Sequence, residues 1–265
     1  MSTKTRNNVH VFGDGTQPIM FAHGYGCDQN MWRLLTPAFS ARYRIILFDL
    51  VGCGKSDLAS YDRGKYGTLQ GHASDVLDIL AEHADAPAVF VGHSVSAMIG
   101  LLAAVSEPER FKSVAMIGPS PCYINDGEYV GGFTREDILS LLDTLDSNYL
   151  GWASAMAPTI MGAPDQPELR QELTNSFCAT DPEIAKHFAR VTFLSDNRAD
   201  LPKLQRRSLI LQCSDDIIAP IEVGRYMHRV MADSVFRIIE NVGHCPHLSS
   251  PDAIIEALNE FLTIE

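Results

Sequence analysis

Short apolar runs rich in β-branched residues alternate along this chain with stretches whose apolar residues recur at helical spacing. Runs such as AVFV and LILQC are almost continuously apolar, which is typical of strands buried on both faces of a parallel sheet. This alternation predicts an α/β fold with a mostly parallel, doubly wound sheet. The predicted strands cover residues 18–22, 44–49, 88–92, 113–117, 209–213 and 235–239, and the predicted helices between them cover residues 68–84, 95–105, 221–231 and 252–262, the last expected to begin at Pro251.

The alternation stops between residues 119 and 200, where four helical stretches are predicted, near residues 134–148, 151–161, 167–178 and 181–194. Ligands of such sheets bind outside the carboxyl ends of the strands, so a helical insertion after one strand is well placed to cover a site there. We therefore expect an α/β core made of residues 1–118 and 201–265, with residues 119–200 inserted as a helical cap.

Composition and charge narrow the classes of function. Of the 265 residues, 46% are apolar and 20% are charged, which argues against a fibrous or wholly disordered chain. The 33 acidic residues exceed the 21 basic ones, and the net charge of −12 would repel a nucleic acid. We find neither a long apolar run nor the apolar core of a signal peptide. We expect a soluble cytoplasmic protein that binds neither nucleic acid nor membrane.

The cysteines and histidines do not indicate a disulfide framework or a metal site. The six cysteines are scattered singly, without a CxxC pair, so we expect mostly free thiols in a reducing compartment. His244, Cys245 and His247 stand close together, but no further cluster of metal ligands accompanies them. We expect neither a metal nor another cofactor.

The strongest motif for chemistry is Gly92-His93-Ser94-Val95-Ser96. It follows a predicted buried strand and passes directly into an apolar helical stretch, which is typical of a nucleophile elbow. Such a turn needs small residues two positions before and after the nucleophile, because the strand and the helix nearly collide there. Glycine is usual at both positions, and this chain has serine at the second. We expect the turn to form nonetheless, with Ser94 as the nucleophile.

A serine hydroxyl needs a base and a group that orients the base. Proteins with this elbow carry Ser, then Asp or Glu, then His along the chain. Asp215 and Asp216 follow one predicted strand, and His244 and His247 follow the next. We favour His244 because Gly243-His244 opens the loop directly after its strand, whereas the residues alone leave both aspartates as candidates.

An early loop, His23-Gly24-Tyr25-Gly26, follows the first predicted strand. In a fold with a nucleophile elbow, such a loop supplies one backbone N–H to bind a developing oxyanion, and the residue after the nucleophile supplies the other. Tyr25 and Val95 are therefore expected to form the oxyanion hole.

Five stretches together carry a family resemblance: HGYGCDQNMW (23–32), GHSVSAMIG (92–100), GPSPCYIND (118–126), SDDIIAP (214–220) and GHCPHLS (243–249). The chain resembles the small α/β-hydrolases of the RsbQ type, which include a bacterial stress regulator, and the related plant karrikin and strigolactone receptors. The resemblance implies an α/β-hydrolase fold with a triad of Ser94, Asp216 and His244. Asp216 is selected over Asp215 because its spacing to Pro220 matches the acid loop of this family.

The resemblance also implies that the cap encloses an apolar pocket. Large apolar residues of the cap and of the catalytic loops are candidates for its lining, although each taken singly is also an ordinary core residue. Phe133 and Phe193 are favoured by their position in the family. The expected substrate-binding residues are Tyr25, Phe133, Trp152, Met156, Phe193, Ile217 and Ile218.

Two functions fit these residues. The first is a serine hydrolase that cleaves a small hydrophobic ester or a butenolide-like lactone through an acyl-enzyme. The second, implied by the resemblance, is a signalling protein or receptor in which ligand binding or slow hydrolysis regulates a protein partner, such as a PAS-containing phosphatase. Dehalogenases and epoxide hydrolases of this fold need an aspartate nucleophile, so Ser94 disfavours both. Perhydrolase and carbon–carbon hydrolase activities use the same triad and stay open.

Overall fold

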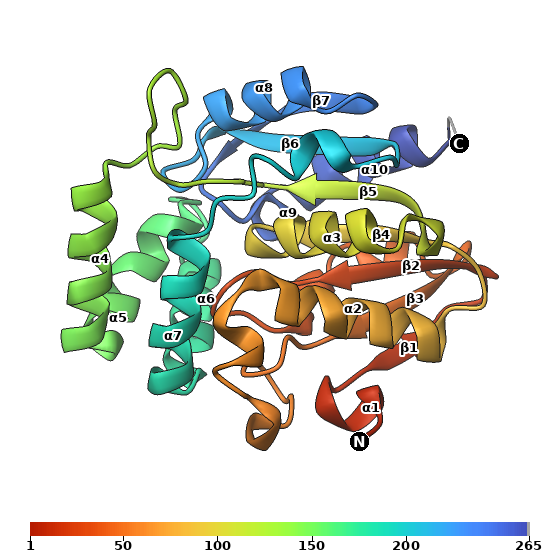
Figure 1. Ribbon diagram of the computed structural model, residues 1–265, viewed down its shortest axis with the longest axis horizontal. Helices are drawn as coiled ribbons and strands as arrows, with labels where there is room; N and C mark the ends of the chain where they lie inside the picture. Colours follow the sequence, from red (N-terminus) through yellow and green to blue (C-terminus); the bar gives the residue numbers. More distant parts are fainter. Residues whose placement is uncertain (264–265) are drawn as a thin grey trace.

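The computed structural model describes residues 1–263 and is built around a seven-stranded sheet (Figure 1). The strand order is β1-β3-β2-β4-β5-β6-β7. All neighbouring strands are parallel except β1, which pairs antiparallel with β3 at one edge. The predicted mostly parallel α/β sheet is therefore confirmed. The strands are β1 (His10–Phe12), β2 (Gln17–Ala22), β3 (Tyr43–Phe48), β4 (Ala88–His93), β5 (Phe111–Ile117), β6 (Ser208–Asp215) and β7 (Ser234–Val242).

Side chains of the central strands alternate between two hydrophobic clusters, one on each face of the sheet. Met20 and Phe90 lie in the cluster that contains residues of α2 (Leu69–His83), α3 (Val95–Ser106) and α8 (Ile221–Val230). Ile19 and Val89 lie in the other cluster, together with residues of α10 (Pro251–Thr263) and of the 3₁₀ segments near residues 29–38. Helices thus cover both faces, which explains the continuously apolar strands.

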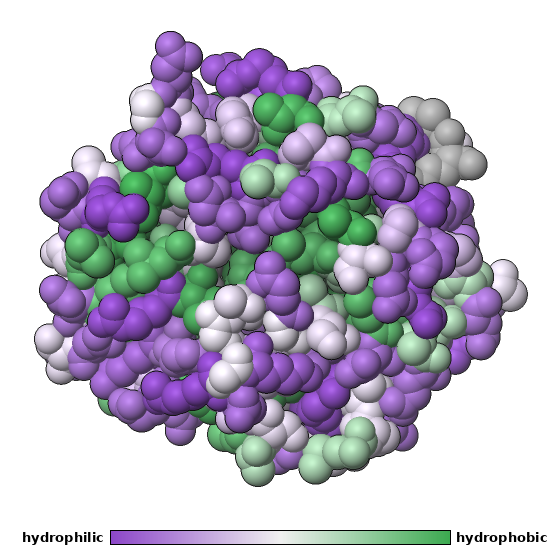
Figure 2. All heavy atoms as spheres, in the orientation of Figure 1, coloured by the Kyte–Doolittle hydropathy of each residue, from purple (hydrophilic) through white to green (hydrophobic). Residues whose placement is uncertain are grey.

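Four helices lie between β5 and β6 in sequence and gather in space beyond the carboxyl end of β5 (Figure 1). Thr134 begins the first of them with a capping box, in which its hydroxyl accepts from the Asp137 N–H and the Asp137 carboxylate accepts from the Thr134 N–H. The surface seen in Figure 2 is mostly hydrophilic, with a smaller hydrophobic area over these helices. The helices are α4 (Arg135–Ser147), α5 (Tyr149–Met161), α6 (Pro167–Ala179) and α7 (Pro182–Phe193).

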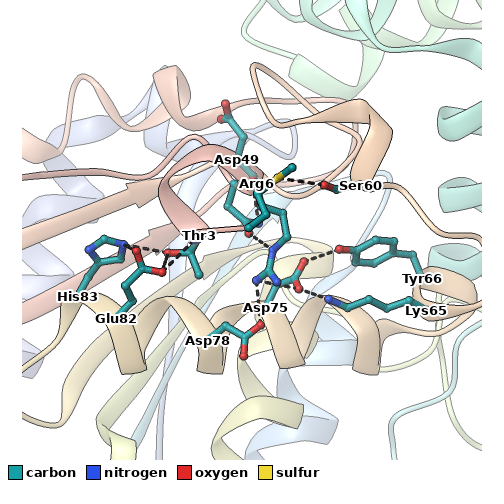
Figure 3. A network of polar contacts seen from close by, with 12 residues as sticks. Thr3, Arg6, Asp49, Ser60, Lys65, Tyr66, Asp75, Asp78, Glu82 and His83 are labelled. Carbon is teal, nitrogen blue, oxygen red and sulfur yellow. Dashed lines mark hydrogen bonds and ion pairs between the residues drawn. The ribbon is translucent and has the colours of Figure 1, made fainter.

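A buried ion cluster fastens the N-terminal segment to the core (Figure 3). The Asp75 side chain on α2 is 1% exposed, and it pairs with Arg6 at 3.1 Å and with Lys65. The Tyr66 hydroxyl donates to the same carboxylate at 2.8 Å. Two cations and a hydroxyl compensate for removing this carboxylate from water, so the cluster holds α1 (Thr3–Arg6) against α2.

Two further observations bear on the predicted class of protein. All six cysteines are free thiols, as expected from their spacing. Within residues 1–263, no helix combines the length and the apolar character needed to cross a lipid bilayer.

Candidate functional site

Ser94 occupies the turn between the end of β4 and the first residue of α3. Its φ of 56° and ψ of −123° lie in a strained region for a non-glycine residue, and its N–H donates to the Ile117 carbonyl of β5 at 2.8 Å. A Cβ atom at Gly92 would lie 2.6 Å from the Ser96 carbonyl oxygen, so this position requires glycine. The turn therefore holds the Ser94 hydroxyl at the edge of the sheet, as a nucleophile elbow does.

Ser96, which stands where glycine is usual, has a contact of its own. Its buried hydroxyl donates to the His23 carbonyl, and so joins the first turn of α3 to the loop that follows β2. The His23 ring also holds that loop, because its Nε2 accepts from the Leu50 N–H at 3.0 Å. At Gly24 a Cβ atom would lie 2.6 Å from Nδ1 of His93, so this residue must be small. These contacts fix the backbone of the loop beside Ser94.

Three side chains from different strand ends meet in one hydrogen-bonded array. The Ser94 hydroxyl lies 2.8 Å from Nε2 of His244, and Nδ1 of His244 lies 2.6 Å from Oδ2 of Asp216. The other carboxylate oxygen of Asp216 accepts from the backbone N–H groups of Ile218 at 2.8 Å and Ala219 at 3.2 Å. All three residues of the array are buried. Because Asp216 directs one oxygen at the imidazole, the geometry allows a proton to pass from the serine to the histidine.

The structure also separates the alternative residues from this array. The Asp215 side chain is exposed, and it is the backbone carbonyl of this residue that accepts from the Gly243 N–H at 2.7 Å. The His247 ring is buried against Trp32 and His93, with centroid distances of 4.8 and 4.3 Å. Burial lowers the pKa of His247 well below its usual value, so this ring is neutral.

Two backbone contacts position the loop that carries His244. The His93 Nε2–H donates to the His244 carbonyl at 2.8 Å, and burial lowers the pKa of His93 to about 3. On the other side, the His244 N–H donates to the Ile160 carbonyl of α5 at 2.8 Å. In a continuing helix that carbonyl would bond residue 164, but Pro164 has no N–H. The end of α5 is therefore free to bind the histidine loop, and the Ala163 N–H adds a bond to the Val242 carbonyl at 3.2 Å.

A small cavity of about 40 Å³ lies over the serine. Four of the residues expected to bind substrate line it, namely Tyr25, Trp152, Phe193 and Ile218. Its wall is mostly apolar, and burial raises the pKa of the Cys27 and Cys245 thiols, which keeps both neutral. The complete lining is Tyr25, Cys27, His93, Ser94, Tyr123, Trp152, Ile160, Leu173, Phe177, Thr192, Phe193, Ile218, His244 and Cys245.

Phe133, Met156 and Ile217 were expected in this lining, and among the described residues they do not belong to it. Ile217 is 46% exposed, because the turn held by the Asp216 carboxylate directs this side chain outward and buries Ile218 instead. Phe133 and Met156 are half-buried and pack against the edge of the hydrophobic core. Their assignment to substrate binding stays a prediction, and the cavity as described does not support it.

Tyr123 is a cavity residue that the sequence reasoning missed. Its ring is buried and packs against Phe193 at a centroid distance of 5.0 Å. Burial raises the pKa of Tyr123 above its usual value. Its place within the GPSPCYIND stretch was a usable signal, since that stretch follows β5 at the same edge of the sheet.

The residues at this site offer no obvious place for a metal ion. Across residues 1–263, no group of three or more His, Cys, Asp and Glu side chains is arranged to hold one. The His93 ring lies between two other imidazoles, with centroid distances of 5.0 Å to His244 and 4.3 Å to His247, and is tilted against both.

Comparisons with known proteins agree with this geometry. The model of the alpha/beta hydrolase family matches residues 19–257. The chain is 39% identical to "Probable esterase D14L" of Oryza sativa subsp. japonica, covering 95% of this chain and 94% of that protein. It is 36% identical to "Karrikin insensitive 2 receptor CA" of Petunia hybrida, with the same coverage of 95% and 94%. A solved structure of a hydrolase from Oleispira antarctica superposes with a TM-score of 0.95 at 41% identity, covering 99% of this chain and 97% of that one. The chain therefore belongs to the alpha/beta hydrolase family.

Proposed function

We propose that this protein hydrolyses a small hydrophobic ester or lactone, with Ser94 as the nucleophile, His244 as the general base and Asp216 as the group that orients the base. The observation that carries the proposal is the continuous hydrogen-bond chain from the Ser94 hydroxyl through both nitrogens of His244 to the Asp216 carboxylate. Each contact lies within the range in which a positioned side chain transfers or orients a proton.

The first half of the proposed reaction acylates the enzyme. Ser94 Oγ attacks the carbonyl carbon of the ester while its proton moves to Nε2 of His244. The tetrahedral intermediate then collapses, its bond to the leaving oxygen breaks, and His244 returns the proton to that oxygen. Asp216 remains ionised throughout and stabilises the imidazolium. In the second half, water attacks the acyl carbon and gives a proton to His244, the bond to Ser94 Oγ breaks, and His244 returns the proton to Ser94.

The negative charge on the carbonyl oxygen needs two donors, for which we propose the backbone N–H groups of Tyr25 and Val95. Val95 is the first residue of α3, so its N–H has no acceptor within the helix and lies at the positive end of the helix dipole. Tyr25 lies in the loop that His23 and Ser96 hold in place, and its hydroxyl donates to the Ala185 carbonyl of α7 at 3.0 Å. The anchored loop supports a preorganised oxyanion hole.

The substrate class follows from the cavity. Its wall is apolar and carries neutral thiols and a neutral His93, which suits an uncharged ligand. A lactone is a cyclic ester that the same steps open. We further propose that residues 119–200 act as a cap, because α5, α6 and α7 supply Trp152, Phe177 and Phe193 to the cavity wall. The cavity of about 40 Å³ is small, and we propose that these helices shift outward when a substrate enters.

The test is the hydrolysis of 4-nitrophenyl butyrate by the Ser94→Ala variant. We expect kcat/KM to fall by at least about a thousand-fold, because no other described hydroxyl or thiol of the cavity lining is hydrogen-bonded to a histidine ring. Ser147→Ala, which removes an exposed hydroxyl of α4, serves as the matched control and is expected to retain the wild-type rate. Activity in Ser94→Ala above a tenth of the wild-type rate would overturn the assignment.

A receptor function is a second candidate, and the observation that favours it is the name of the Petunia hybrida relative. In that case the protein binds a butenolide tightly and turns it over slowly, and the bound state is the signal. Single-turnover kinetics beside the thermal shift of Ser94→Ala with a butenolide panel separate the two functions. Many turnovers per minute without a ligand-induced shift favour the enzyme, whereas a large shift with fewer than one turnover favours the receptor.

A further inference from the structure

Most polar side chains in the cavity wall already have partners within the protein. The Tyr25 hydroxyl and the Cys27 thiol each donate to a backbone carbonyl, and both nitrogens of His244 belong to the array with Ser94. Two buried polar atoms that belong to lining residues have no hydrogen-bond partner among residues 1–263, the Thr192 hydroxyl and Nδ1 of His93. Thr192 is 2% exposed, and its hydroxyl makes no hydrogen bond to a described protein group.

This arrangement is unusual for a threonine in a helix. Its hydroxyl commonly donates to the carbonyl four residues earlier, as Thr144 does to Ser140 in α4 and Thr174 does to Arg170 in α6, both at 2.8 Å. Thr192 lies in the last turn of α7 and makes no such bond. Valine has nearly the same shape and would fill this position without an unpaired polar atom, so the hydroxyl calls for an explanation.

We propose that Thr192 is a specificity-determining residue whose hydroxyl hydrogen-bonds a second oxygen of the substrate. This inference rests on the proposed function and narrows its substrate class. The substrate is an ester or lactone that carries another carbonyl, ether or hydroxyl oxygen apart from the carbonyl that Ser94 attacks. The second oxygen is uncharged, because apart from the Ser94 array the wall offers only apolar side chains, neutral rings, neutral thiols and hydroxyls.

The location of Thr192 supports this role. It precedes Phe193, whose ring packs against Tyr123, and all three residues line the same cavity as Ser94. Thr192 thus belongs to the α7 wall of the cavity, whereas Ser94 is held by the edge of the sheet. A ligand that fills the cavity contacts both, and an oxygen of the ligand at α7 regains the bond that the threonine lacks. Such a bond favours the correct ligand because the alternative leaves the hydroxyl unpaired.

Paired esters test the inference directly. In each pair one methylene is replaced by a carbonyl, as in 4-nitrophenyl pentanoate against 4-oxopentanoate, hexanoate against 5-oxohexanoate, and heptanoate against 6-oxoheptanoate. Acetate esters of the matching alcohols place the carbonyl on the other side of the scissile bond. The measured quantity is the ratio of kcat/KM within each pair, so that a general change in activity cancels.

Three variants give the comparison. For at least one pair we expect the preference for the oxygen-containing ester to fall about 3- to 10-fold in Thr192→Val and to return in Thr192→Ser, which keeps the hydroxyl. Thr144→Val, on the exposed face of α4, is the matched control and leaves the ratio unchanged. Thermal unfolding adds a second readout, since removing an unpaired buried hydroxyl leaves the Tm of Thr192→Val equal to the wild-type value or higher.

The inference is overturned if no pair changes its ratio in Thr192→Val. A lower Tm with unchanged ratios would likewise overturn it and give the hydroxyl a structural role. These failures are distinct from a failure of the proposed function. If Ser94→Ala abolishes hydrolysis while all ratios stay constant, the serine mechanism holds and the role of Thr192 does not.

Discussion

Replacing Asp216 with asparagine isolates the contribution of one charge, because the two side chains have nearly the same shape. The asparagine Oδ1 can still accept from the N–H groups of Ile218 and Ala219, so the loop keeps its turn. Its Nδ2 then faces Nδ1 of His244, where the carboxylate oxygen accepted at 2.6 Å. Two donors cannot face each other, so His244 places its proton on Nε2, the atom 2.8 Å from the Ser94 hydroxyl. A protonated Nε2 cannot accept the serine proton.

The expected loss in kcat is about 10³- to 10⁴-fold, which corresponds to about 4–5.5 kcal/mol of transition-state stabilisation. Steady-state hydrolysis of 4-nitrophenyl butyrate measures it, and urea unfolding verifies that the variant is folded. Asp215→Asn is the matched control, since the neighbouring carboxylate is exposed and only its backbone contacts the histidine loop. An Asp216→Asn variant within tenfold of the wild type would refute the reasoning, as would an equal loss in Asp215→Asn.

Two further substitutions test the core. His72 is fully buried, neither ring nitrogen has a partner among the described residues, and burial lowers its pKa to about 3. The unfolded chain binds a proton here below about pH 6.5 and the folded chain does not, so stability falls by about 1.4 kcal/mol per pH unit as the pH drops from there toward 3. We therefore expect His72→Phe to move the midpoint of acid unfolding, measured by circular dichroism, to lower pH. His10→Gln, at an exposed position, is the control and leaves the midpoint in place. An unchanged midpoint in His72→Phe contradicts the burial argument. Arg6→Ala removes one of the two cations that pair with the buried Asp75, so we expect the free energy of unfolding in urea to fall by about 1–3 kcal/mol. Arg44→Ala, which breaks an ion pair at the surface, is the control and lowers it less. Equal losses of unfolding free energy in the two variants would count against the cluster.

The parts of the fold that could be predicted are those with a local signal. Strands buried on both faces need continuous apolar runs, and helices on a sheet need apolar residues at helical spacing, so the main elements were found within a few residues. β1 could not be found this way, because its three residues are exposed and β1 is specified by pairing with β3. α1 and α9 (Pro246–Ser249) have four residues each, too few to show a period.

The candidate site also has parts that the sequence predicts and parts that it does not. Parallel strands bring their carboxyl ends to one edge of a sheet, so the order of serine, aspartate and histidine along the chain pointed to side chains that meet. It did not separate Asp216 from Asp215, and that choice came from the family resemblance. The cavity wall has no comparable rule. Whether Phe133 or Thr192 lines the cavity depends on how residues 119–200 pack against the core. From the sequence, a polar residue in an amphipathic helix is predicted to lie at the surface.

The hydrogen bond between the His244 N–H and the Ile160 carbonyl connects the cavity wall to the loop that carries the imidazole. α5 supplies Trp152 and Ile160 to the cavity wall and also holds the His244 loop in position. If the proposed function holds, a wide ligand that displaces α5 outward would also displace His244 through this bond. A narrow ligand would leave the imidazole in place, so the bond would favour cleavage of narrow substrates.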